Sequence, residues 1–140
     1  MTPQARADQW APPAGTEVEM IEVGSYWDIV RAPADLGECV LELLGDRSGA
    51  VIADYGLMYW FIPSGQAPHF RRLRQEIHAL GTHGAGTAYV GVPPIRWKEG
   101  PRLHWRIPVG PDRYLTDPYR LREALIRAIA VEPAGEAKPR

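Results

Sequence analysis

The 140-residue sequence has one cysteine, two lysines and no asparagine. Because Cys39 has no second thiol to pair with, a hydrophobic core rather than disulfides must hold the fold together. Cys39 lies beside the apolar stripe of a predicted helix, which favours a small core group over a nucleophile. No apolar run approaches the roughly 18 residues of a membrane span, and the N-terminus lacks the basic and apolar parts of a secretory signal. We therefore expect a cytoplasmic protein with no membrane partner.

Spacings typical of metal or phosphate sites are also missing. The chain has four histidines, at positions His69, His78, His83 and His104. No two of them share a helical face with a carboxylate between them, as the zinc hydrolase motif requires. Gly81, Gly84 and Gly86 resemble a phosphate loop, but neither the Lys-Ser/Thr ending nor a following helix is present. We interpret that segment as a turn before a strand, and we predict neither a metal nor a cofactor.

Charge is distributed unevenly along a chain whose net charge is only -1. Residues 1–48 carry three basic and nine acidic side chains, whereas residues 49–130 carry eleven basic and six acidic ones. This asymmetry predicts one acidic and one basic surface, which would suit a polar partner or self-association. Arginine outnumbers lysine by 14 to 2, a ratio that codon bias in a high-GC genome explains more simply than function does.

The pattern along the chain predicts one α+β domain with flexible ends. Residues 1–16 and 131–140 contain too few large apolar groups to offset their ordering entropy, so the domain is expected to span residues 17–130. A helix from Pro33 to Leu44 is expected to end at Gly45. A second helix is expected to begin at Pro118, with Asp117 as its cap. Its buried stripe would consist of Leu121, Ala124, Leu125, Ala128 and Ile129.

Strands are predicted at 18–23, 27–31, 87–92 and 103–108, and a β-hairpin at 49–63 turns at Tyr55-Gly56. The hairpin is apolar on both faces, which indicates central strands covered on both sides. In 103–108, His104 and Arg106 are expected to face outward. The segment 70–80 fits either a helix or a strand. Together these elements predict a mixed or antiparallel central sheet of five to six strands with two main helices.

Basic and aromatic side chains provide the candidate contact residues. Trp97 has no evident buried position in a loop after Pro93-Pro94, so we predict that it and His104 contact a partner. Trp27, Trp60 and Trp105 lie on predicted strands and are assigned to the core. Guanidinium groups near an aromatic ring can hold phosphates and stack a base. The candidate phosphate or nucleic-acid contacts are Arg71, Arg72, Arg74, Arg96, Lys98 and Arg106.

The order of several short segments resembles a known family. They lie at 28–33, 49–51, 59–63, 86–94 and 104–108, and the most specific are a glycine-strand-Pro-Pro segment and the Trp105-Arg106-Ile107-Pro108 strand. The chain is similar over residues 27–108 to the N-terminal domain of bifunctional DNA primase/polymerase proteins, in the short form common in actinobacteria. These prim-pol proteins form a branch of the archaeo-eukaryotic primase superfamily. The resemblance implies a primase/polymerase-like fold.

The catalytic residues that this resemblance implies are not at the corresponding positions. The family uses an acidic pair at a strand end for divalent metal ions, a histidine on the next strand and a further acid later. Here Asp54 ends a strand but Gly56 replaces the second acid, and Met58 and Tyr59 stand where the histidine is expected. Several carboxylates are needed to organise two metal ions. We therefore expect no enzyme activity; only under a residual primase/polymerase hypothesis would Asp54 ligate a metal.

Two functional hypotheses follow. The first is a non-catalytic, prim-pol-like binding or regulatory protein that contacts a protein partner or itself. The second is a nucleic-acid or nucleotide-binding protein that uses the basic side chains.

Overall fold

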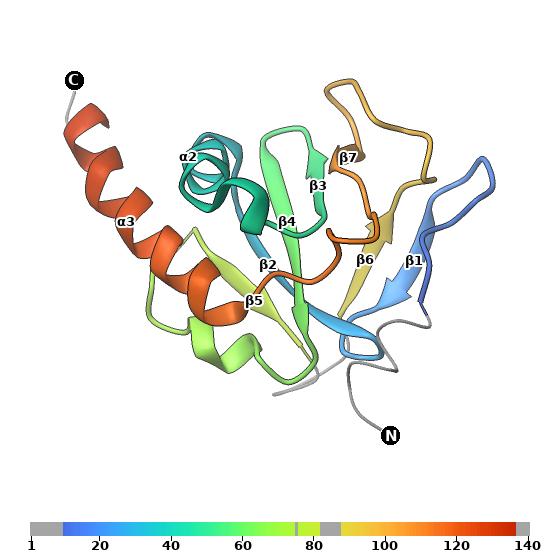
Figure 1. Ribbon diagram of the computed structural model, residues 1–140, viewed down its shortest axis with the longest axis horizontal. Helices are drawn as coiled ribbons and strands as arrows, with labels where there is room; N and C mark the ends of the chain where they lie inside the picture. Colours follow the sequence, from blue (N-terminus) through green and yellow to red (C-terminus); the bar gives the residue numbers. More distant parts are fainter. Residues whose placement is uncertain (1–9, 75, 82–87, 137–140) are drawn as a thin grey trace.

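The computed structural model describes residues 10–74, 76–81 and 88–136. Its centre is a five-stranded antiparallel sheet (Figure 1). Across this sheet the strand order is β5 (His78–Leu80), β2 (Trp27–Pro33), β4 (Leu57–Pro63), β3 (Val51–Asp54) and β7 (His104–Ile107). The strands β1 (Glu19–Glu22) and β6 (Tyr89–Val92) pair with each other in a separate antiparallel ribbon.

Two helices, α2 (Ala34–Leu44) and α3 (Pro118–Glu136), cover one face of the five-stranded sheet, which we call the rear face. The β1–β6 ribbon and nearby loops cover the other, front face (Figure 1). Two short 3-10 helices, η1 (Gly45–Arg47) and η2 (Ala67–Phe70), complete the elements. The α+β prediction is confirmed, and of the two sheet types predicted, the antiparallel one is present. The sheet has five strands because 19–22 and 89–92 pair with each other instead of joining it.

The helices begin and end where local chemistry favours it. Gly45 has φ +59 and donates its N–H to the carbonyl of Leu41, which ends α2 in a conformation that glycine adopts easily. Asp117 Oδ2 accepts a hydrogen bond from the N–H of Arg120 at 2.9 Å and so caps α3. Four residues of the predicted α3 stripe are buried and Ile129 is half-buried, as expected for the face that packs on the sheet.

Alternation along the strands sends side chains to two separate clusters. Val30 and Trp60 contribute to the rear cluster, with the apolar stripes of both helices. Ile29 and Phe61, their neighbours in the chain, contribute to the front cluster beneath the ribbon. The predicted two-sided burial of the hairpin is therefore confirmed, and Trp27, Trp60 and Trp105 are all core residues. Cys39 is half-buried against the rear cluster.

Residues with defined contacts or helical structure lie beyond both ends of the range 17–130. The Trp10 ring lies 5.3 Å from that of Trp27 and 5.7 Å from that of Tyr114, and the Pro13 carbonyl accepts a hydrogen bond from Ile95 N–H. Trp10 and Pro13 thus pack on the domain, because aromatic stacking offsets the ordering of a few residues. At the other end α3 continues to Glu136, beyond residue 130. Residues 1–9 and 137–140 lie outside the described residues.

The segment 70–80, whose sequence fits either a helix or a strand, ends in the strand β5. The 3-10 helix η2 ends at Phe70, and β5 pairs with β2 at the edge of the sheet. Phe70 and Ile77 are buried in the rear cluster, whereas Leu73 only packs against it. The apolar residues that suggested helical spacing therefore anchor a turn and an edge strand. His83, Gly84 and Gly86 lie outside the described residues, as does Thr87 of the predicted strand.

Candidate functional site

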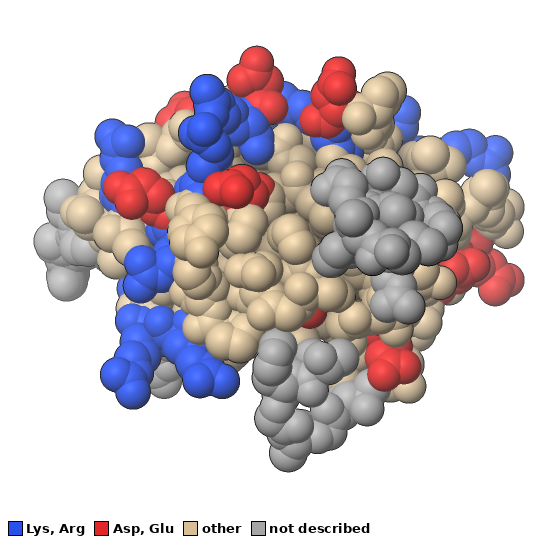
Figure 2. Space-filling view, turned by 60° about the horizontal axis from the view of Figure 1, so that its bottom comes forward, with Lys and Arg blue, Asp and Glu red and all other residues tan. Residues whose placement is uncertain are grey.

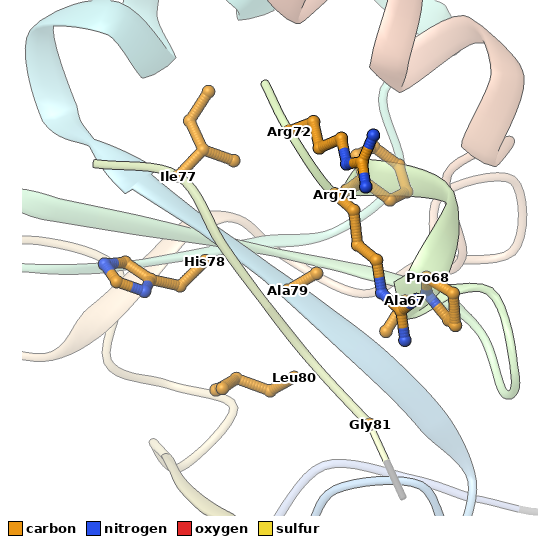
Figure 3. Close-up of a pocket in the computed structure, with 10 residues that line it drawn as sticks. Ala67, Pro68, Arg71, Arg72, Ile77, His78, Ala79, Leu80 and Gly81 are labelled. Atoms are coloured by element: carbon orange, nitrogen blue, oxygen red, sulfur yellow. The ribbon is translucent and has the colours of Figure 1, made fainter. Parts of the chain in front are cut away.

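A pocket of about 370 Å³ lies between η2 and the edge strand β5. The side chains of Arg71 and Arg72 lie on one side of β5, and those of His78 and Leu80 point to the other (Figure 3). Phe70 is buried next to the two arginines and anchors this segment to the rear cluster. Most residues that line the pocket are apolar by type, and Arg71 and Arg72 supply two positively charged guanidinium groups.

Asp28 and Arg122 hold one wall of this pocket in place. The Asp28 carboxyl is fully buried, and its Oδ2 accepts hydrogen bonds from the N–H groups of Gly65 and Ala67, both at 2.9 Å. A Cβ at Gly81 would lie 2.8 Å from the same oxygen, so only glycine permits this approach of β5 to Asp28. Arg122 of α3 donates from Nε to the His69 carbonyl at 3.0 Å. Hydrogen bonds to Asp28 therefore attach the loop before η2 to β2, and the hydrogen bond from Arg122 attaches η2 to α3.

Arg71 and Arg72 are exposed, and no carboxylate pairs with either of them in the part of the chain that the structure describes. Arg72 has φ +64, a left-handed conformation that is unusual for a residue with a Cβ. Residues in this conformation are found in tight turns and cluster at functional sites. Two adjacent guanidinium groups beside an open pocket can bind an anionic ligand such as a phosphate.

Two of the other candidate arginines are neutralised by glutamates. Arg74 Nε donates to Glu76 Oε1 at 2.8 Å, and this hydrogen bond holds the pKa of Glu76 below its usual range. Arg106 of β7 makes two hydrogen bonds to Glu38 of α2, at 3.0 and 2.8 Å. These bonds lower the pKa of Glu38 and raise that of Arg106. Both arginines therefore have carboxylate partners already.

The six candidate basic residues do not form one strip. Arg71 and Arg72 lie beside β5 at one edge of the five-stranded sheet, whereas Arg106 lies on β7 at the opposite edge. Arg96 and Lys98 are exposed in the loop between β6 and β7. On the face in Figure 2, basic side chains gather toward the left and the centre is mostly uncharged. The acidic and basic parts of the chain also meet in space, since Glu38 pairs with Arg106.

The outer face of the β1–β6 ribbon is an exposed apolar surface. Met20 is 63% exposed and Tyr89 56% exposed, and Val18 is also exposed. A Cβ at Gly91 would lie 3.2 Å from Val18 Cγ1 and 3.5 Å from Met20 Sδ, which places both side chains around this glycine. Val90 and Val92 point inward to the front cluster. One face of the ribbon therefore completes the core, and the other presents apolar groups to solvent.

The loop after β6 holds Trp97 partly exposed, as the sequence predicts. Its side chain is 40% exposed. Its backbone is fixed at both polar groups, because its N–H donates to the Pro94 carbonyl at 3.0 Å and its carbonyl accepts from Trp105 N–H at 2.7 Å. His104 is half-buried, and its Nδ1 lies 2.6 Å from the Arg102 carbonyl, so this nitrogen donates to that carbonyl. The contact of either residue with a partner stays a prediction.

Asp54 ends β3, half-buried, beside the exposed Tyr55. Among the residues that the structure describes, no three of His, Cys, Asp or Glu gather in a group that could hold a metal ion. Within the same residues, no helix combines the length and apolarity needed to cross a bilayer.

Sequence reasoning missed two charged residues of β2. Asp28 and Arg31 interrupt an apolar strand and lie on opposite faces of the sheet, Asp28 toward the rear cluster and Arg31 toward the front. The sequence signal that could have identified them is a charged residue within a mostly apolar strand, because a buried charged group requires a polar partner. The partners of Asp28 come from a loop whose position only the folded chain reveals.

No family model, no curated protein and no solved structure matches this chain.

Proposed function

We propose that this chain is a non-catalytic, prim-pol-like binding or regulatory protein of the cytoplasm that acts through protein–protein contacts. The observation that carries this proposal is the exposed apolar outer face of the ribbon, with Val18, Met20 and Tyr89 around the flat position Gly91. Exposed Met and Tyr side chains are typical of contact surfaces. Trp97, held by its backbone in the adjoining loop, supplies a large and rigid anchor.

Charge around the ribbon indicates what kind of partner fits. Glu17, Glu19 and Glu22 are exposed on and next to β1. An apolar centre flanked by carboxylates matches a protein segment with apolar side chains and flanking basic residues. In this ribbon β1 and β6 pair only with each other among the described residues, so a partner segment could also add as a further strand.

The proposal is tested by affinity capture from the native cells with the intact chain as bait, compared with a Met20→Glu/Tyr89→Glu variant. Both side chains are more than half exposed, so the variant should keep its stability within about 0.5 kcal/mol. The captured partner should be lost from the variant and kept by a Tyr119→Glu control, which changes an exposed tyrosine on α3. A partner retained equally by all three proteins, or none at all, would refute the proposal.

A second candidate function, binding of nucleotides or single-stranded nucleic acid, is favoured by the pocket beside β5. Arg71 and Arg72 lie together at this pocket and make no ion pair with a described carboxylate. A strand bound by these guanidinium groups should dissociate as salt is added, because bound phosphates release counterions. The Arg71→Glu/Arg72→Glu variant should bind labelled single-stranded DNA at least ~10-fold more weakly at low salt. Absence of low-salt binding by the natural chain would exclude this function.

A further inference from the structure

Three polar side chains lie next to one another across the front face of the five-stranded sheet. Arg31 of β2 pairs directly with Tyr59 of β4 on one side and with His78 of β5 on the other. Residues paired in this way point to the same face, with Cβ atoms about 4.5–5.5 Å apart. The guanidinium group therefore lies between a phenol and an imidazole on three neighbouring strands.

The row formed by His78, Arg31 and Tyr59 lies at the edge of the front cluster. The adjacent row on the same face is Leu80, Ile29 and Phe61, which are all apolar members of that cluster. Ile29 and Phe61 are fully buried, whereas Arg31 and Tyr59 are half-buried and His78 is exposed. All three side chains thus border the apolar cluster and keep part of their surface in solvent, although the Nε atom of Arg31 is itself buried.

The Arg31 side chain is incompletely satisfied. Its Nε is buried and makes no hydrogen bond within the described residues. A guanidinium group stays charged at any physiological pH and cannot accept a proton from a neighbour. A buried donor on a charged group costs free energy unless an acceptor reaches it, and native proteins rarely leave one without a reason. An anion bound against the guanidinium group would supply that acceptor once a small movement of the side chain exposes Nε.

We propose that Arg31, Tyr59 and His78 form a binding site for the phosphate group of a small ligand. The planar guanidinium fork can donate from Nε and a terminal nitrogen to two phosphate oxygens. The Tyr59 hydroxyl and an N–H of His78 can donate to the remaining oxygens from either side. A tetrahedral anion with several acceptor oxygens uses all three donor groups, whereas a carboxylate has only two oxygens to offer.

This site adjoins the pocket beside β5, because His78 is one of the residues that line that pocket, whereas Arg31 and Tyr59 are not. His78 points to the opposite side of β5 from Arg71 and Arg72 (Figure 3). The exposed residues of the ribbon lie on its outer face, away from the sheet. The phosphate site can therefore be tested without assuming either a protein partner or nucleic-acid binding.

The test follows the Arg31 Nε–Hε resonance in ¹H–¹⁵N spectra of the labelled natural chain. Inorganic phosphate, acetate and chloride are titrated separately at constant ionic strength and neutral pH. Phosphate should shift this resonance along a saturating curve with a millimolar dissociation constant, while chloride leaves it in place. A shift of equal size with chloride, or tighter binding of acetate than of phosphate, would overturn the proposal. So would the absence of any saturating shift.

Conservative variants test which side chains donate hydrogen bonds to the phosphate. Arg31→Lys keeps the charge but loses the fork, and should weaken phosphate binding by ~10-fold; Tyr59→Phe removes only the hydroxyl and should weaken it by ~3-fold. The Arg120→Gln variant, which removes an exposed arginine on α3, serves as control and should bind phosphate as the natural chain does. Loss of binding in an Arg71→Gln/Arg72→Gln variant, with full binding by Arg31→Lys and Tyr59→Phe, would assign the phosphate to Arg71 and Arg72 and refute the proposal.

Discussion

The two faces of the five-stranded sheet are built in different ways. The rear face is covered by α2 and α3, whose leucine and valine side chains pack on Val30, Trp60 and Ile62. The front face is covered by a two-stranded ribbon and loops, and its cluster is rich in aromatic rings. The Phe61 ring lies 4.6 Å from that of Trp27 and 5.8 Å from that of Trp105.

This difference explains where the candidate sites lie. Two helices bury the rear face broadly, so the charged group of β2 on that side, Asp28, is enclosed and given hydrogen bonds. A narrow ribbon leaves the margin of the front face open, and there Arg31 is half-buried with an unsatisfied Nε. The two helices bury the side chains of the rear face and so stabilise the fold. The ribbon covers the front face only in part and leaves polar and apolar side chains there exposed to a ligand or partner.

The largest loss of stability is expected when a buried side chain is truncated to alanine. Comparing such variants tests whether the front face of the sheet is as well packed as the rear face. Phe61→Ala should lower the free energy of unfolding by about 4 kcal/mol, since it removes a fully buried ring with three aromatic neighbours. Leu125→Ala on the rear face should cost about 3 kcal/mol. Urea denaturation followed by fluorescence measures both. A loss below about 1 kcal/mol for Phe61→Ala would show a loosely packed front cluster.

The next largest loss of stability is expected when the buried carboxyl of Asp28 is removed. Asp28→Ala leaves the N–H groups of Gly65 and Ala67 without their acceptor and should cost about 2 kcal/mol. Asp28→Asn keeps one acceptor oxygen and should cost less. Amide hydrogen exchange at residues 65–70 should accelerate in the alanine variant, because the loop and η2 are then released from β2. Unchanged exchange would mean that Asp28 does not hold this wall of the pocket.

A smaller effect is expected for the ion pair that joins α2 to β7. Since Arg106 lowers the pKa of Glu38, the pair stabilises the fold above the unfolded pKa of Glu38 and loses that contribution as pH falls through the folded pKa. Both side chains are substantially exposed, so Glu38→Gln should cost only about 0.5 kcal/mol near neutral pH. The difference from the natural chain should vanish in acid. A difference that persists there would point to packing instead of charge.

The smallest change in stability is expected on the front face of β2. Arg31→Met replaces a group that lacks a hydrogen bond at Nε by an apolar one of similar length, and should change the free energy of unfolding by less than about 0.5 kcal/mol, or raise it. Asp28→Ala on the same strand provides the contrast. If Arg31→Met were as destabilising as Asp28→Ala, Arg31 would be a structural residue, and the two faces would not differ in this respect.

Local features of the fold were predictable because they depend on residues close together in the chain. The apolar spacing of α2, its end at Gly45 and the cap of α3 at Asp117 all follow from such short-range preferences. The turn at Tyr55-Gly56 likewise joins strands that are neighbours in the sequence. The exposed Trp97 and the three buried strand tryptophans were also anticipated from their surroundings.

Features that depend on distant segments could not be predicted in this way. Strands β1 and β6 pair although about half of the chain lies between them, and Trp10 stacks on Tyr114 from outside the expected domain. Strand periodicity says which face a residue occupies but not which strand lies beside it. For the same reason the arginines suggested a single strip, while the fold sends Arg71 and Arg106 to opposite edges of the sheet.

The amino-acid sequence by itself determined the α+β class, the two helices, the central hairpin, the buried stripe of α3 and the three core tryptophans, because periodicity and capping act within a few residues. Only the tertiary structure decided which charged groups are satisfied. Asp28 received two N–H donors from a loop 37 to 39 positions away, while Arg31, three residues further along the same strand, kept a buried Nε without a partner. Hydrogen bonds of this kind depend on positions in space, and the packing of the whole chain sets those positions.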